Sequence, residues 1–231
     1  MNSVILKEKI FKQASLITKT INYVSIGIVI WILKFPECYN YMLIACLLMP
    51  IIGILFVRLS NGIIKIEAKR NSSNPNALPV FLPSLFLAFR IYSDFNIQDY
   101  SKMCFPVGII TIVFSAFFLV GDRSYLEIDN WYKVILRIVL FSFIYAFGVV
   151  IGFNCVFDKS APKVFASTVI YKRIQSIGIK SYEIEVSREK KSERMKLSID
   201  GNTYHQLQVG GNVKTYVFTG VFNIPWVDVK D

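Results

Sequence analysis

Long runs without Asp, Glu, Lys or Arg are the first pattern in the chain, and they lie before residue 158. A helix that crosses ~30 Å of hydrocarbon needs ~20 mostly apolar residues. Four runs approach that length; the first contains Lys19 near its start, where a lysine stem can reach the headgroups. So many runs leave no polar helices to cover a soluble core. We therefore predict four transmembrane helices, at about residues 17–34, 38–57, 103–121 and 135–157.

A fifth apolar segment, residues 77–89 (ALPVFLPSLFLAF), is too short to span alone. Pro79 and Pro83 interrupt its helical hydrogen bonding. We expect either a helix lying in the membrane interface or a re-entrant segment, and the sequence leaves both open.

After residue 158 the pattern changes to period two, which is typical of half-buried strands. The Gly210-Gly211 pair marks a turn, Thr203 is suited to cap a short helical turn, and residues 188–194 (REKKSER) fit a hairpin loop. We predict a transmembrane domain, residues 1–157, and a small all-β domain of OB or SH3-like size, residues 158–231. The expected strands cover residues 163–174, 182–186, 195–199, 213–218 and 221–229.

The composition agrees with this division, because 54% of the 231 residues are hydrophobic and only 18% are charged. Such a chain is neither disordered nor an ordinary soluble enzyme. The net charge of +10 divides into +3 up to and including Lys19, +3 between the second and third spans, and +4 in the tail, because the other charges cancel. Because basic segments face the cytoplasm, we expect a multi-pass protein of the bacterial inner membrane with both termini cytoplasmic.

Small residues gather on one side of the last predicted span, where Gly148 and Gly152 form a G-x-x-x-G pair. Small side chains let helix backbones approach closely. We expect this face to pack within the bundle or against a second copy of the chain. Its residues are Ser142, Ala146, Gly148 and Gly152.

No pattern in the sequence indicates an enzyme, a cofactor or a metal site. His205 is the lone histidine, the four cysteines have no zinc-like spacing, and no glycine-rich phosphate loop precedes a helix. The eight acidic residues of the tail argue against nucleic-acid binding. Four of its basic residues fit anionic lipid headgroups instead: Arg188, Lys190, Lys191 and Arg194.

Two stretches resemble segments of uncharacterised bacterial four-span inner-membrane proteins with a carboxy-terminal β-domain. One is LPSLFLAFRIYSDFNIQDYS, a Pro-led and Leu-rich segment with an Arg and Asp-Phe-Asn. The other is the end, YHQLQVGGNVKTYVFTGVFNIPWV, in which a turn leads through glycine into a strand and a Pro-Trp ending. The residues that carry the second resemblance are Tyr204, Leu207, Gly211, Gly220, Pro225 and Trp226.

In size, span number and lack of catalytic motifs the chain also resembles the small immunity proteins of bacteria. These protect against pore-forming, colicin-like toxins or membrane-targeting type VI secretion effectors, although the colicin type has no such tail domain. The resemblance implies a cognate toxin as partner, and we expect the contact to involve the spans, the outer connections at residues 34–40 and 121–133, and the face formed by Gly148 and Gly152.

Three functions follow from these patterns. The first is a non-enzymatic immunity protein, and the alternative is a membrane-anchored scaffold whose cytoplasmic β-domain recruits a protein partner. The third, a channel or transporter subunit, fits less well because the middles of the predicted spans lack ionisable side chains.

Overall fold

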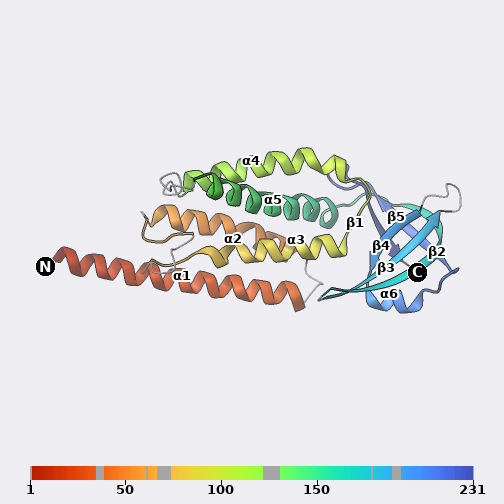
Figure 1. Ribbon diagram of the computed structural model, residues 1–231, viewed down its shortest axis with the longest axis horizontal. Coiled ribbons are helices and arrows are strands. Elements are labelled where there is room, and N and C mark those ends of the chain that lie inside the picture. The colour runs from red at the N-terminus through yellow and green to blue at the C-terminus, as the bar shows by residue number, and fades with distance from the viewer. Residues whose placement is uncertain are drawn as a thin grey trace. The chain divides into compact units, whose positions relative to one another are not determined.

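Apolar helices form the first part of the chain and an antiparallel sheet forms the last part (Figure 1). Contacts divide the chain into a helical unit, Met1–Ala88 with Pro106–Val149, and a β-unit, Phe89–Phe105 with Val150–Asp231. The β-unit therefore includes short segments from before residue 158 as well as the tail. The computed structural model describes residues 2–34, 39–60, 62–66, 74–121, 131–177, 179–188 and 194–230.

Four of the described helices are long and apolar enough to cross a membrane, which confirms a multi-pass helical region. They are α1 (Asn2–Lys34), α2 (Tyr39–Leu59), α4 (Cys104–Gly121) and α5 (Trp131–Val156). Their apolar windows lie within Glu8–Lys34, Tyr39–Leu59, Tyr100–Val120 and Trp131–Val156, within a few residues of most predicted ends. The exception is α1, whose helix begins well before residue 17.

The fifth apolar segment forms a 3-10 turn, η1 (Leu78–Phe81), and then α3 (Leu82–Asp94). Its two prolines do not break a helix. Pro79 and Pro83 each lie in the first turn of their element, where a missing N–H leaves no helical bond unmade.

This segment lies beside the middle of α2 in the helical unit. A Cβ atom at Gly53 would come within 2.7 Å of Val80 Cγ1, so these two elements approach closely. Farther along, the Ser84 hydroxyl donates a hydrogen bond to the Cys46 carbonyl at 2.8 Å. Because residue numbers rise on one element and fall on the other, α3 runs antiparallel to α2.

The contacts between α3 and α5 show the opposite order of residue numbers. The Phe81 and Phe141 ring centroids are 6.3 Å apart, and a Cβ atom at Gly148 would lie 3.3 Å from the Ala88 Cα atom. These pairs rise together along the chain, so α3 runs parallel to α5.

The direction of α4 completes the order of the helical unit. The Phe118 ring lies 5.1 Å from the Phe81 ring, and the Phe114 ring stacks at 4.1 Å on Tyr145. Therefore α4 runs against both α3 and α5. Since α1 and α2 also reverse, the five segments alternate, and α1 begins at the end of the unit opposite to the one where α5 ends.

A proline in α2 explains the hydrogen bond between α2 and α3. Pro50 has no N–H, so the Cys46 carbonyl lacks the helical donor that would come from position 50. Ser84 supplies that donor from α3, and the Tyr145 hydroxyl donates to the next carbonyl, that of Leu47, at 3.2 Å. Backbone groups in hydrocarbon must be satisfied internally, so neighbouring side chains compensate for the interrupted helix.

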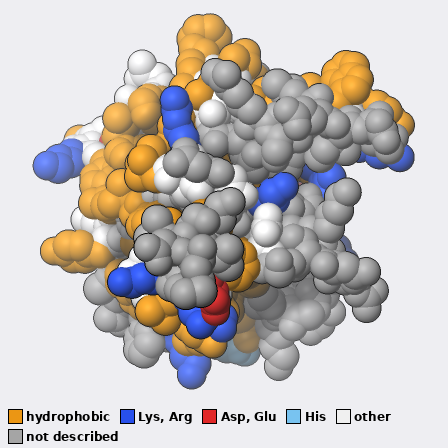
Figure 2. Space-filling model, turned by 90° about the vertical axis from the view of Figure 1, so that its left-hand side faces the viewer, with side chains coloured by type: hydrophobic (Ala, Val, Ile, Leu, Met, Phe, Trp, Pro, Cys, Tyr) orange, Lys and Arg blue, Asp and Glu red, His pale blue; other side chains and the backbone are white. Residues whose placement is uncertain are grey.

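The outer faces of α1 and α4 carry large apolar side chains that no other part of the unit covers. Hydrophobic side chains accordingly occupy much of the described surface in Figure 2, which views the molecule from the end where α1 begins. Such a surface suits contact with lipid or with another membrane helix. Its most exposed residues include Leu16, Tyr23, Val24, Phe105, Ile112 and Val113.

The β-unit contains a six-stranded antiparallel sheet in the order β1-β6-β5-β2-β3-β4. Its core is formed by alternate residues of these strands, as the period-two pattern predicts. The strands are β1 (Asn96–Ile97), β2 (Lys163–Ile177), β3 (Ile179–Arg188), β4 (Arg194–Ile199), β5 (Asn212–Phe218) and β6 (Trp226–Lys230).

Three sequence expectations for this unit are corrected. The helical turn is α6 (Gly201–Gln206), and Asp200 rather than Thr203 caps it, accepting from the Asn202 and Thr203 amides at 2.9 and 3.1 Å. The last strand begins at Trp226, not at residue 221, because a turn occupies residues 219–225. Finally, β1 lies far from the tail in sequence and was not predicted.

Candidate functional site

Asn96 connects the two edges of the β-sheet. The backbone of β1 pairs with β6, while the Asn96 side chain turns to β4. Its Nδ2 donates to the Ser198 carbonyl at 2.8 Å, and its Oδ1 accepts from the Ser198 amide at 2.6 Å. This side chain thus makes the pair of bonds that a backbone residue makes in an antiparallel ladder, and the sheet becomes barrel-like.

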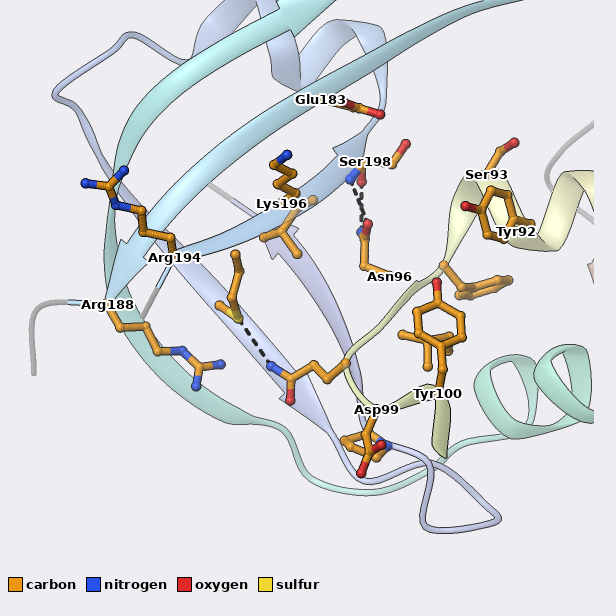
Figure 3. A pocket seen from close by; sticks show the side chains of 16 residues that line it. Tyr92, Ser93, Asn96, Asp99, Tyr100, Glu183, Arg188, Arg194, Lys196 and Ser198 are labelled. Carbon is orange, nitrogen blue, oxygen red and sulfur yellow. Dashed lines mark hydrogen bonds between the residues drawn. The ribbon is translucent and has the colours of Figure 1, made fainter. Parts of the chain in front are cut away.

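Beyond this connection the edges separate and leave a groove of about 780 Å³. One wall is β4, and the other is formed by the end of α3, β1 and η2 (Tyr100–Met103). Figure 3 shows Arg188 reaching into the space from β3, with Tyr92 and Tyr100 on the opposite wall. The volume lies within the range of about 300–1,000 Å³ that is typical of ligand pockets.

Three basic side chains belong to the groove. Arg194 and Lys196 are exposed on β4, whereas Arg188 is half-buried, with its Nε and Nη2 atoms fully buried. The guanidinium carbon of Arg188 lies 4.3 Å from the centre of the Phe165 ring, which holds the cation by a cation–π contact. Met195 and Leu197, which alternate with Arg194 and Lys196 along β4, add apolar surface to the groove.

The acidic residue on the other wall is already engaged. Asp99 caps η2 by accepting from the Ser101 amide at 3.0 Å and from its hydroxyl, and Lys102 lies 3.9 Å away. The hydrogen bond from the Ser101 side chain is the main reason that the pKa of Asp99 falls below its usual value, with smaller contributions from its amide and from Lys102. Asp99 therefore stays ionised while serving the fold.

A polar cluster connects the last turn of α5 with the loop between β5 and β6. Asn154 is fully buried; its Nδ2 donates to the Ile224 carbonyl at 2.8 Å, and its Oδ1 accepts from the Phe222 amide at 3.0 Å. Gly220, with φ of +75°, lies against the side-chain amide of Asn154. A Cβ atom at position 220 would overlap both Nδ2 and Oδ1 of Asn154. A glycine is required there.

Asp158, two residues after the end of α5, also binds the loop between β5 and β6. Its Oδ2 accepts from the Gly220 amide at 2.9 Å and from Trp226 Nε1 at 3.0 Å, and its Oδ1 accepts from the Ser160 amide at 2.8 Å. Burial raises the pKa of Asp158, but hydrogen bonds from Ser160, Trp226 and Gly220 outweigh it and leave the pKa below the ordinary value.

Aromatic contacts complete this cluster. The Trp226 ring stacks on Phe218 at 4.3 Å, and Phe95 meets it edge-on at 5.5 Å. The Pro225 carbonyl accepts from the Gln98 amide at 2.9 Å, which extends the pairing of β1 with β6. The Pro-Trp ending and the Asp-Phe-Asn segment, both singled out in the sequence, therefore meet inside the β-unit.

The sequence-predicted packing residues lie along α5. Ser142 and Ala146 are fully buried, Gly148 lies against Ala88 of α3, and Gly152 is buried in the part of α5 that belongs to the β-unit. Whether the chain also associates with a second copy stays a prediction.

The predicted lipid-contact residues separate. Arg188 and Arg194 line the groove, while Lys190 and Lys191 lie outside the described residues. His205 is exposed at the end of α6, edge-on to Tyr182 at 5.7 Å. Among the residues described, no group of three His, Cys, Asp or Glu side chains is placed to hold a metal ion.

The sequence analysis missed two residues of the β-unit. Asn96 lies 102 residues from its β4 partner, and no local pattern marks it. Lys172 donates to the Tyr204 and Leu207 carbonyls at the end of α6, both at 2.5 Å, and lies 4.2 Å from the Tyr204 ring centre. A basic residue near a helix carboxyl end is a known cap, but the sequence places Lys172 far from this helix.

No protein-family model, curated protein or solved structure matches the chain.

Proposed function

We propose that this chain is a membrane-anchored recruitment protein, in which the helical unit holds the protein in a membrane and the β-unit captures a protein partner. The groove between β4 and β1 carries the proposal, because it combines an open strand edge, a half-buried arginine and aromatic side chains in one concave site. Asn154 and Asp158 hold the last turn of α5 inside the β-unit, so the groove lies in the same unit as the end of a candidate membrane helix.

Site-specific photo-crosslinking of the full-length protein in cells tests this function. A crosslinking amino acid replaces Tyr100, which lines the groove and is 47% exposed, or Tyr171 on β2, which is 56% exposed and outside it. A discrete adduct from position 100, absent from position 171, is the expected result. Equal adducts from both positions, or none from either, would contradict the proposal.

The second candidate is an immunity protein against a pore-forming or membrane-targeting bacterial toxin. It is supported by α1, in which only 17% of the apolar window is buried against 44% in α2 and α5, so that one long apolar face is available to a toxin's membrane-inserted helices. The test is expression in a sensitive strain challenged with the toxin encoded beside this gene. Unchanged killing without co-purification of the toxin would eliminate this role.

We infer further that the membrane is the bacterial inner membrane, that the amino terminus is cytoplasmic, and that the β-unit is an OB- or SH3-like barrel. The lysines at the start of α1 support the first two, and the connected edges of a small antiparallel sheet support the third. For the carboxy-terminal tail, charge favours the cytoplasm, whereas the alternating helices favour the other side of the membrane.

A further inference from the structure

The wall of the groove formed by β4 is an open strand edge. In an antiparallel ladder the N–H and C=O of one residue point to the same side, and successive residues alternate. Ser198 directs both groups towards Asn96. Lys196 and Arg194, two and four residues before it, therefore direct theirs towards the same side, into the groove.

Within the described residues, the backbone of β4 pairs with β3 alone, through six residues from Arg194 to Ile199. On the other wall, Gln98 reaches across the gap with its side chain, and its Nε2 lies 3.3 Å from Met195 Sδ. The two edges of the sheet are thus joined at Ser198 and separate along the preceding residues of β4, Lys196 and Arg194. An extended chain can satisfy such an edge by adding as a strand.

The charges of the groove differ between its faces. On the outer face, Arg194 and Lys196 are exposed, in alternation with the half-buried Met195 and the buried Leu197. On the neighbouring strand β3, Glu183, which also lines the groove, lies opposite Ser198, and Glu185 lies opposite Lys196. On the inner face, Arg188 reaches into the groove (Figure 3), which Met195 also lines. A strand lying along β4 would therefore meet a cation with each set of its alternating side chains.

We propose that the groove binds an extended acidic segment of a partner protein, which adds to the open edge of β4 and places carboxylates opposite Lys196 and beside Arg188. The proposal rests on the recruitment function above and names the chemistry of its partner. Cross-strand pairs of opposite charge and charge-assisted hydrogen bonds to arginine supply specificity for acidic residues. Backbone pairing with Lys196 and Arg194 supplies the strand direction and register.

An anionic lipid headgroup has the negative charge of an acidic peptide segment but lacks its peptide backbone. It would use the cations, yet it has no series of N–H and C=O groups to pair with β4. Dependence on backbone hydrogen bonding therefore separates the two ligands.

The test uses the full-length protein in nanodiscs of zwitterionic lipid and a short fluorescein-labelled peptide of alternating Thr and Asp. Comparison peptides carry Lys in place of Asp, or the acidic sequence with N-methyl groups on alternate residues, which removes N–H donors without changing charge. Fluorescence anisotropy should show saturable binding of the acidic peptide only. Equal binding of the N-methylated or the basic peptide would overturn the proposal.

Two variants examine the groove directly. Lys196→Pro removes an edge N–H without touching the bonds between β4 and β3, and Lys196→Ala removes the same charge but keeps that N–H. Arg188→Gln removes the inner cation, with Lys214→Gln as a control on an exposed lysine of β5. We expect Lys196→Pro to weaken binding more than Lys196→Ala, and Arg188→Gln to weaken it by about tenfold, as loss of a charge-assisted bond does. Unchanged affinity in Lys196→Pro and Arg188→Gln would refute the site.

Short-chain phosphatidylglycerol serves as the competing ligand. If it binds in an Arg188-dependent manner while the acidic peptide does not bind, the groove is a headgroup site and the proposal fails. Crosslinking of a partner at position 100 that survives both groove variants would leave the recruitment function standing and refute only the acidic-strand inference.

Discussion

At the residue scale, the carboxylate of Asp158 links α5 to the loop between β5 and β6, and its ionisation should make the stability of the β-unit depend on pH. Because its folded pKa is lowered below 3.8, its contribution is fully present above that pH and is lost as the pH falls through the folded pKa. We expect Asp158→Asn to cost about 1.5–3 kcal/mol at neutral pH, the usual range for a hydrogen bond to a charged group. Calorimetric unfolding from neutral pH to about pH 3 measures this, and the variant should also lose part of the acid dependence. The control is Glu185→Gln on β3; an equal effect of both changes would contradict the assignment.

Gly220 offers a second prediction at this scale, because two causes of strain can be separated there. Its φ of +75° disfavours any side chain, and a Cβ atom would also overlap Asn154 and the Ile224 carbonyl. Gly210 has a similar φ of +86° but nothing within 4 Å of its Cβ position. Gly210→Ala should therefore cost only the backbone term of about 1–2 kcal/mol, and Gly220→Ala distinctly more. Equal melting temperatures for the two variants would show that contact with Asn154 is unimportant.

At the element scale, Pro50 and Ser84 form an interdependent pair between α2 and α3. Ser84→Ala should destabilise the helical unit by about 1–3 kcal/mol, because it leaves the Cys46 carbonyl buried without a donor. In a Pro50→Ala background the new amide at position 50 can bond that carbonyl, so the same serine change should cost much less. Thermal unfolding of the four proteins in detergent measures the coupling. Ser93→Ala, whose hydroxyl bonds only within α3, is the matched control; a purely additive cycle would refute the compensation.

The elements also show what a sequence can predict here. The membrane helices and the tail strands follow from apolar run length and period-two alternation, which are local properties. The groove does not, because Asn96 meets Ser198 across 102 residues, and Arg188 becomes a groove residue only when β3 and β4 are brought beside β1. Helix caps are only partly predictable from sequence. Asp200 and Thr203 are both residue types that cap helices, and the extended backbone at Asp200 shows which of them caps α6.

At the scale of the whole molecule, the alternating directions of the helical segments bear on membrane topology. The charge distribution predicts four spans with both termini cytoplasmic only when the basic tail is counted. Long domains cross membranes largely regardless of their charge, so the tail's +4 carries little weight. The start of α1 and the end of α2, each next to a short basic stretch of the sequence, lie at the same end of the helical unit. We expect both to face the cytoplasm, which requires α3 to carry the chain across to the other side.

We therefore expect the two termini to lie on opposite sides of the membrane. The segment from Leu78 to Asp94 comprises four 3-10 residues and thirteen α-helical residues. At about 2.0 and 1.5 Å per residue it reaches roughly 27 Å, close to the ~30 Å of a hydrocarbon core. Fusions of alkaline phosphatase, active only outside the cytoplasm, and of green fluorescent protein, fluorescent only inside, measure the topology. A fusion after residue 231 should give phosphatase activity, and one between α4 and α5 should fluoresce. The reverse pattern at both sites would restore four spans, with residues 77–89 entering and leaving on one side.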